Sequence, residues 1–100
     1  MKNILLVCAA GMSTSLLVNK MKEAAKTLGV EVNINALPVV ECEKVIETVD
    51  VILLGPQVRF QKVQVEKIAN GRVPVEVIDM RMYGLMNGKA VLERALELIK

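Results

Sequence analysis

The sequence alternates short, unbroken apolar runs with longer segments whose apolar residues recur at helical spacing. Residues 3–7 and 51–54 are the most apolar of the short runs, and such runs are typical of strands that are buried on both faces of a sheet. Residues 30–37 alternate apolar with polar side chains, as an outer strand does, and residues 73–78 are a fourth strand candidate. We therefore expect four strands, with the first and third in the centre of the sheet.

Apolar residues recur every three or four positions between these strands, which indicates amphipathic helices. The clearest cases are residues 13–28, with Gly29 placed to end the helix, and residues 87–99. Residues 41–49 and 60–69 are weaker helix candidates. This alternation favours an α/β fold, a doubly wound structure of three layers with a four-stranded parallel sheet in the order 2-1-3-4 and helices on both faces.

Composition fits one compact domain and excludes several functions. The chain has 100 residues, 53% of them hydrophobic and 24% charged, which suits a single domain with one core. The formal net charge is +2, no block of like charge occurs and aromatic residues make up 2%, so we expect no nucleic-acid binding. No stretch approaches the roughly 18 apolar residues of a membrane span, so we expect a cytoplasmic protein with no direct membrane insertion.

Two cysteines and no histidine limit the chemistry further. Two cysteines in a chain of this size do not build a disulfide framework, and a reducing compartment keeps them as thiols. Cys42 lies on the apolar stripe of residues 41–49, which indicates packing. Cys8, at the end of the first strand, is the candidate nucleophile, although a free cysteine at a strand end also fits a small buried hydrophobe.

The loop after Cys8 has the composition of an anion site. Positions 8–15 read CAAGMSTS, with small side chains, a glycine that permits a tight turn, and three hydroxyl residues that can cap the next helix. Unpaired N–H groups at a helix start favour an anion and a thiolate, and we expect these backbone groups to matter more than any one side chain. Ligands of parallel α/β sheets lie beyond the carboxyl ends of the strands, so the segments after Leu54 and Ile78 belong to the same region.

Other cysteine and phosphate chemistries fit this loop less well. It lacks the glycine and lysine spacing of a Walker loop and has only one glycine of a dinucleotide fingerprint. A cysteine phosphatase carries an arginine six positions after its cysteine, which clamps the phosphoryl group in the transition state, and Thr14 stands there instead. Asp79 would be the general acid of such an enzyme, but it fits a cap of the next turn better. A reductase would need a second cysteine near Cys8, and a binding module without chemistry would have no need of Cys8.

Three segments together resemble a known family. Positions 8–17 read CAAGMSTSLL, positions 51–58 read VILLGPQV, and positions 74–79 read PVEVID, with Tyr-Gly at 83–84. Over nearly the whole chain they are similar to the enzyme IIB components of the bacterial phosphoenolpyruvate-dependent sugar phosphotransferase system, most of all to the lactose/cellobiose class. The resemblance implies a phosphocarrier, a protein-phosphocysteine–sugar phosphotransferase that forms a single domain over residues 1–100.

The resemblance also implies the reaction and the partners. Cys8 takes a phosphoryl group from a phosphohistidine of enzyme IIA and passes it to a sugar, such as the β-linked disaccharides cellobiose, chitobiose or lactose, held by the membrane component IIC. No metal and no organic cofactor is implied. The residues that match the family's phosphate-binding loop are Ala10, Gly11, Met12, Ser13, Thr14 and Ser15.

A rim of exposed residues around the loop is expected to dock IIA and IIC in turn. Phe60 and Met82 fit core positions equally well, since both are large and apolar. The expected rim residues are Met12, Arg59, Phe60, Met82 and Tyr83.

Overall fold

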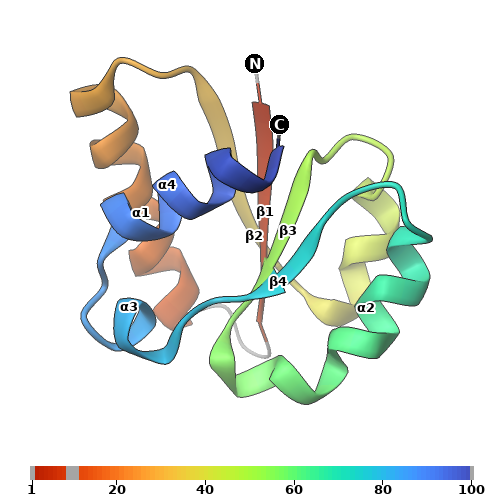
Figure 1. The fold of residues 1–100 in the computed structure, drawn as a ribbon. Coiled ribbons are helices and arrows are strands. Elements are labelled where there is room, and N and C mark those ends of the chain that lie inside the picture. Colours follow the sequence, from red (N-terminus) through yellow and green to blue (C-terminus); the bar gives the residue numbers. More distant parts are fainter. Residues whose placement is uncertain (1, 9–11, 100) are drawn as a thin grey trace.

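The computed structural model of the chain describes residues 2–8 and 12–99, and for residues 12–14 it describes the backbone alone. Four strands form one parallel sheet in the order β2-β1-β3-β4, which confirms the expected order (Figure 1). The strands are β1 (Lys2–Cys8), β2 (Val32–Pro38), β3 (Val51–Leu54) and β4 (Val75–Val77). The two apolar runs, β1 and β3, lie in the centre, and all four residues of β3 are buried.

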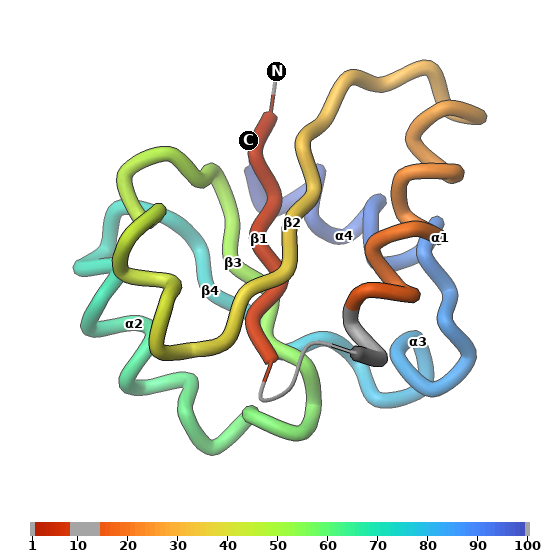
Figure 2. Tube along the Cα trace, turned by 180° about the vertical axis from the view of Figure 1, so that it is seen from behind, coloured from red at the N-terminus to blue at the C-terminus, as the bar shows by residue number. Residues whose placement is uncertain are grey.

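Helices cover both faces of this sheet, as expected for three layers (Figure 1, and Figure 2 from behind). On one face lie α1 (Met12–Leu28), α3 (Met80–Gly84) and α4 (Gly88–Ile99), and on the other η1 (Val39–Val45), η2 (Pro56–Gln61) and α2 (Lys62–Ala69). The helix α1 ends at Gly29, whose φ of 72° is the left-handed conformation that favours glycine. Within the described residues, no helix combines the length and apolar character needed to cross a membrane.

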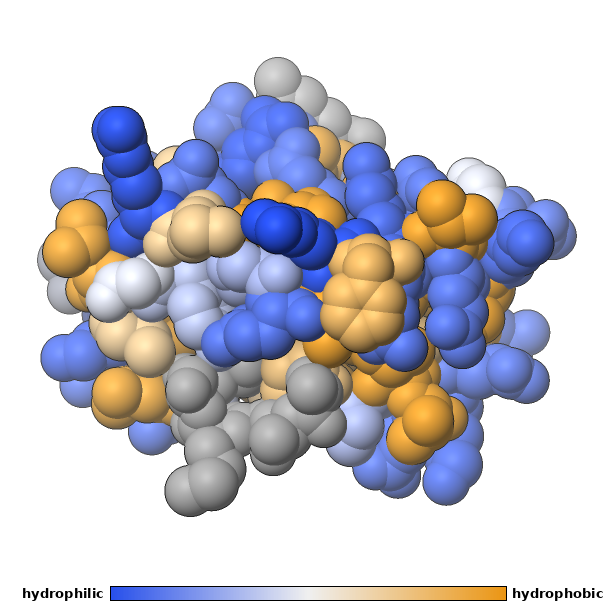
Figure 3. Space-filling view, turned by 90° about the horizontal axis from the view of Figure 1, so that it is seen from below, coloured by the Kyte–Doolittle hydropathy of each residue, from blue (hydrophilic) through white to orange (hydrophobic). Residues whose placement is uncertain are grey.

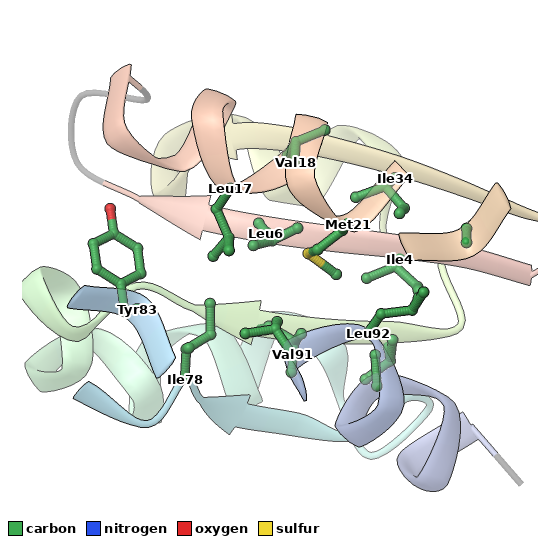
Figure 4. Packing of buried hydrophobic residues seen from close by; sticks show 14 residues of the cluster. Ile4, Leu6, Leu17, Val18, Met21, Ile34, Ile78, Tyr83, Val91 and Leu92 are labelled. Carbon is green, nitrogen blue, oxygen red and sulfur yellow. The ribbon is translucent and has the colours of Figure 1, made fainter. Parts of the chain in front are cut away.

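Alternation along β1 divides the core into two clusters. Ile4 and Leu6 point to the α1–α4 side and pack with Leu17 and Leu92 (Figure 4), whereas Leu5 and the other odd positions point to the η1–α2 side. Successive side chains of a strand face opposite sides of a sheet, so a strand that is apolar at every position requires a helical layer on each side. The composition of β1 therefore dictates the layered structure.

Three local elements differ from the expected ones. In place of the helix expected over residues 41–49, the structure has the 3-10 helix η1 (Val39–Val45), which begins directly after Pro38 and buries Val39 and Cys42. These two residues are three positions apart, and a spacing of three matches the period of a 3-10 helix. The 3-10 helix η2 (Pro56–Gln61), before α2, was not expected. The helix α3 was not expected, because five residues are too short to show helical periodicity.

The helix α4 lies close against the backbone of α1 at Gly88. A Cβ atom at this position would lie 2.5 Å from the carbonyl carbon of Lys20 and 2.6 Å from the amide nitrogen of Met21. Both neighbours are backbone atoms, so neither can move aside without shifting α1. The glycine therefore sets the distance between the two helices.

We expect Gly88→Ala to lower the free energy of unfolding by about 1–3 kcal/mol, the usual cost of overpacking a well-packed contact. Gly84→Ala is the matched control, because no atom lies within 4 Å of a Cβ at Gly84. Alanine favours a helix over glycine by about 1 kcal/mol, so the control should be neutral or slightly stabilising. Denaturant unfolding of the three proteins measures both effects, and equal stability of the two variants would contradict the role of Gly88.

Candidate functional site

Cys8 is the last residue of β1 and lies at the carboxyl end of the central part of the sheet. Its side chain is 3% exposed, and in the β1–β2 register it lies opposite Pro38. The helix α1 begins four positions later, at Met12, so Cys8 comes shortly before a helix start along the chain. This position suits a nucleophilic cysteine that accepts an anionic group, because N–H groups at a helix start favour anions.

The predicted phosphate loop is only partly described. Ala10 and Gly11 lie outside the described residues, and so do the side chains of Met12, Ser13 and Thr14. The backbone of residues 12–15 forms the first turn of α1, and that turn contains no acidic residue. Since helix N-termini favour anions, the described part of the loop is compatible with a phosphate site.

The carboxyl ends of three strands meet next to Cys8. The amide of Gly55, directly after β3, donates a hydrogen bond of 2.8 Å to the carbonyl of Val7. The amide of Ile78, directly after β4, donates one of 2.8 Å to the carbonyl of Leu54. These bonds bring the segments after β3 and β4 to the end of the molecule at which Cys8 lies, as the sequence predicted from the parallel sheet.

A groove of about 510 Å³ opens at this end. It is lined by Pro56, Gln57, Arg59, Phe60, Met80, Tyr83 and Gly84. Arg59, Phe60 and Met80 are exposed, and Phe60 is 77% exposed. Figure 3 shows this end of the molecule, where hydrophobic and hydrophilic residues lie interspersed. A surface of this kind, with large apolar groups among charges, is typical of a contact site for another protein.

The rim predicted from the sequence is partly wrong. Arg59 and Phe60 are exposed, so the core alternative for Phe60 is excluded. Tyr83 is 8% exposed and belongs to the core on the α1–α4 side, and Met82 is half-buried against the same core. Both lie on α3, which packs against α4 on that side of the sheet. Met80, which is exposed in the groove, was missed, although its position after the predicted strand end at Asp79 is a usable signal.

Asp79 caps α3, as the sequence favoured. One carboxylate oxygen accepts hydrogen bonds from the amides of Arg81, at 2.8 Å, and Met82, at 3.3 Å. These amides have no intrahelical partner, so the cap satisfies two donors at the start of a short helix. The interaction fixes the direction in which α3 leaves β4.

Cys42 is the second thiol, and it lies away from the strand ends. Its side chain is fully buried in the η1–α2 cluster, which confirms the packing prediction. Burial raises the pKa of the Cys42 thiol, and the nearby Glu43 charge raises it further. A neutral buried thiol is a poor nucleophile. Both cysteines are free, and no cluster of three or more metal-ligating residues occurs in the described part of the chain.

A second groove, of about 430 Å³, runs along β4 and contains an ion pair. The guanidinium of Arg94 donates two hydrogen bonds, of 2.6 and 2.7 Å, to the carboxylate of Glu76. This bidentate contact holds the pKa of Glu76 below its usual range. Because the two charges satisfy each other, the pair ties α4 to β4 and we assign it a structural role.

This chain is similar to proteins of one family in sequence, and solved structures of that family have the same fold. A family model described as "PTS system, Lactose/Cellobiose specific IIB subunit" matches residues 3–94. The oligo-beta-mannoside-specific EIIB component of Bacillus subtilis (strain 168) is 46% identical over 100 residues, covering 99% of this chain and 97% of that protein.

Two solved structures are similar over almost the whole chain. The cellobiose-specific phosphotransferase IIB component from Borrelia burgdorferi has a TM-score of 0.82 at 41% identity, covering 98% of this chain and 91% of its own. The lactose-specific IIB component domain from Streptococcus pneumoniae has a TM-score of 0.87 at 22% identity, covering 99% and 98%. The latter likeness concerns the fold alone, and it includes the layered sheet described above.

We expect Asp79→Ala to lower the free energy of unfolding by about 1 kcal/mol, because the helix start loses its cap. Asp79→Asn should stay close to the unmodified protein, because asparagine caps as well as aspartate does. Denaturant unfolding of the three proteins measures the difference. If Asp79→Asn were as unstable as Asp79→Ala, the charge of Asp79 and not its capping geometry would be what stabilises α3.

Proposed function

Because the chain belongs to the lactose/cellobiose-specific IIB family of the phosphotransferase system, we propose that it is a phosphocarrier with Cys8 as the phosphorylated residue. Cys8 takes the phosphoryl group from a phosphohistidine of enzyme IIA and gives it to a sugar bound by the membrane component IIC. The observation that carries this proposal is the position of Cys8, at the carboxyl end of a central strand and four positions before the start of α1. A location of the protein in the cytoplasm, where both partners can be reached, is part of the proposal.

The proposed transfer consists of two balanced displacements at phosphorus. First, the Cys8 thiolate attacks, the S–P bond forms, the N–P bond breaks, and the leaving imidazole of IIA keeps the electron pair and takes a proton. Second, a sugar hydroxyl attacks, the O–P bond forms, the S–P bond breaks and Cys8 leaves as a thiolate, while the hydroxyl proton passes to solvent. The chain has no histidine, so in this scheme the partners provide both the imidazole and the hydroxyl.

The backbone N–H groups of the loop and of the first turn of α1 hold the phosphoryl group in this proposal. The residues concerned are Ala10, Gly11, Met12, Ser13, Thr14 and Ser15. The 17-residue length of α1 and the lack of an acidic residue in its first turn support an anion at this point. No metal or organic cofactor takes part in the scheme.

The groove with Arg59, Phe60 and Met80 is proposed as the docking surface for IIA and IIC. Its support is its place at the carboxyl ends of the strands, next to the segment that contacts Val7, and its exposed apolar groups. The substrate is proposed to be a β-linked disaccharide such as cellobiose, chitobiose or lactose. The relatives named above are specific for an oligo-β-mannoside, cellobiose and lactose, so one fold accompanies several sugars, and we assign the choice of sugar to IIC.

We expect Cys8 to accept the phosphoryl group and Cys42 not to. After incubation with phosphoenolpyruvate, the general phosphotransferase proteins and the IIA protein of the same system, intact mass should show one added phosphoryl group. Cys8→Ser should lack it and Cys42→Ser should keep it, because Cys42 lies in the η1–α2 core away from the strand ends and its raised pKa favours the neutral thiol. Phosphorylation of the Cys8→Ser protein would overturn the assignment.

We also expect the phosphorylated protein to be stable until a partner discharges it. Thr14 stands where a cysteine phosphatase has its arginine, so the transition state for attack by water lacks that clamp. After removal of all donors, the decay of the phosphorylated mass should be slow, and IIA or IIC with sugar should discharge it quickly. Decay in water alone at the rate seen with a partner would favour a phosphatase.

A further inference from the structure

We propose that enzyme IIA binds this chain through carboxylates on its own surface that pair with Arg59 and Arg81. The inference rests on the proposed function and adds to it the chemistry of the partner surface. Arg59 lines the groove at the strand ends, and Arg81 follows Met80 on α3. Both arginines are exposed, so both are open to contact with another protein.

The charges at this end of the molecule are few. Two carboxylates and two guanidiniums occur in the segments directly after the four strands, which are residues 9–16, 39–41, 55–61 and 78–85. The carboxylate of Asp79 accepts hydrogen bonds from two amides of α3, and the carboxylate of Glu41 lies 3.6 Å from the ammonium of Lys44. Neither Arg59 nor Arg81 has an ion-pair partner among the described residues. The described part of the chain therefore leaves both guanidiniums without a carboxylate.

A partner that covers the groove removes water from Arg59 together with its apolar neighbours. Phe60 and Met80 line the same groove and are 77% and 61% exposed, so they are the apolar groups that a partner can bury here. Arg59 directly precedes Phe60 and lines the groove with it. A guanidinium that loses water is costly unless an acceptor replaces the water, and a carboxylate matches two of its N–H groups at once. The partner is therefore the source of that carboxylate.

Arg81 has a different task, because it is exposed on α3 but does not line the groove, whereas Met80 before it does. An exposed charge at the rim of an interface mainly speeds the encounter with an oppositely charged partner, and salt weakens this attraction. Arg59 thus contributes a paired contact within the interface, and Arg81 contributes attraction before contact is made.

Titration with unphosphorylated IIA of the same system tests the inference, because this form of IIA has no phosphoryl group that an arginine could bind instead. Arg59→Gln should raise Kd about tenfold or more, as loss of one partner of a desolvated charge pair does. Arg59→Glu should raise Kd further, because like charges would then face each other. From about 0.01 M to about 0.15 M ionic strength the Debye length falls from about 30 Å to about 8 Å, so Kd of the unmodified protein should rise, and Arg81→Gln should show a smaller rise.

Arg72→Gln is the matched control. Arg72 is also exposed and has no ion-pair partner among the described residues, but it precedes β4, whereas Arg81 follows it, so the two lie at opposite ends of that strand. The control removes the same charge and should leave both Kd and its salt dependence unchanged. None of the three arginines is part of an ion pair within the described residues, so all variants should keep the melting temperature of the unmodified protein, which thermal unfolding checks.

Equal Kd for the Arg59→Gln and Arg72→Gln proteins would overturn the inference. Equal Kd for Arg59→Gln and Arg59→Glu would do so too, because the acceptor on IIA would then carry no charge. An unchanged salt dependence in Arg81→Gln would remove the task assigned to Arg81. A lower maximal rate of transfer from phosphorylated IIA, with Kd for unphosphorylated IIA unchanged, would assign Arg59 to the phosphoryl group and would also overturn the inference.

Failure of the proposed function itself is detected separately. If the unmodified protein accepted no phosphoryl group on Cys8, intact mass would show this before any variant is compared. A protein that is phosphorylated normally, but whose affinity for IIA does not depend on Arg59, would leave the phosphocarrier function intact and overturn only the assigned partner chemistry.

Discussion

The parallel pairing of β1 with β3 is the constraint on which the rest of the structure depends. The register places Ile4 opposite Val51 and Val7 opposite Leu54, so two strands that are apolar at almost every position lie side by side. Such a pair has no face that tolerates water, and both faces must be covered by helices. The same pairing continues past Leu54, where the Gly55 amide donates a hydrogen bond to the Val7 carbonyl. This bond brings the segment after β3 close to Cys8. The pairing of β1 with β3 therefore determines both the layers of the fold and the geometry of the site.

The parts of the fold that the sequence predicts are those fixed by local pattern. Continuous apolar runs identify β1 and β3, the alternating pattern identifies β2 as an edge strand, and Gly29 identifies the end of α1. The helix expected over residues 41–49 is present as a 3-10 helix over residues 39–45, and its type was not predicted because Cys42 and Val45, three positions apart, suit both an α-helix and a 3-10 helix. Over so short a segment, hydropathy alone does not distinguish the two.

One part of the candidate site can also be predicted from the sequence, and another part cannot. Its nucleophile position, at the end of an apolar run and before a loop of small residues, is visible in the sequence. The exposures of Phe60 and Tyr83 are not, because they depend on contacts between segments distant along the chain. Tyr83 lies on α3, which starts at the Asp79 cap, and its ring lies beside Gly55. Two aromatic residues near strand ends look alike in sequence, and tertiary packing decides which one is buried.

The contact between α4 and α1 at Gly88 bears on the site through α1. Gly88 meets the backbone of Lys20 and Met21 near the middle of α1, and Leu17 and Met21 are fully buried between the helix and the sheet. A helix held at its middle on both sides has little freedom to slide or tilt, so its first turn keeps a fixed position relative to the end of β1. In the proposed mechanism the phosphoryl group is held by backbone N–H groups, which cannot adjust as a long side chain can. A carrier that relies on backbone donors therefore needs a rigid helix, and the contact at Gly88 provides that rigidity away from the surface where partners dock.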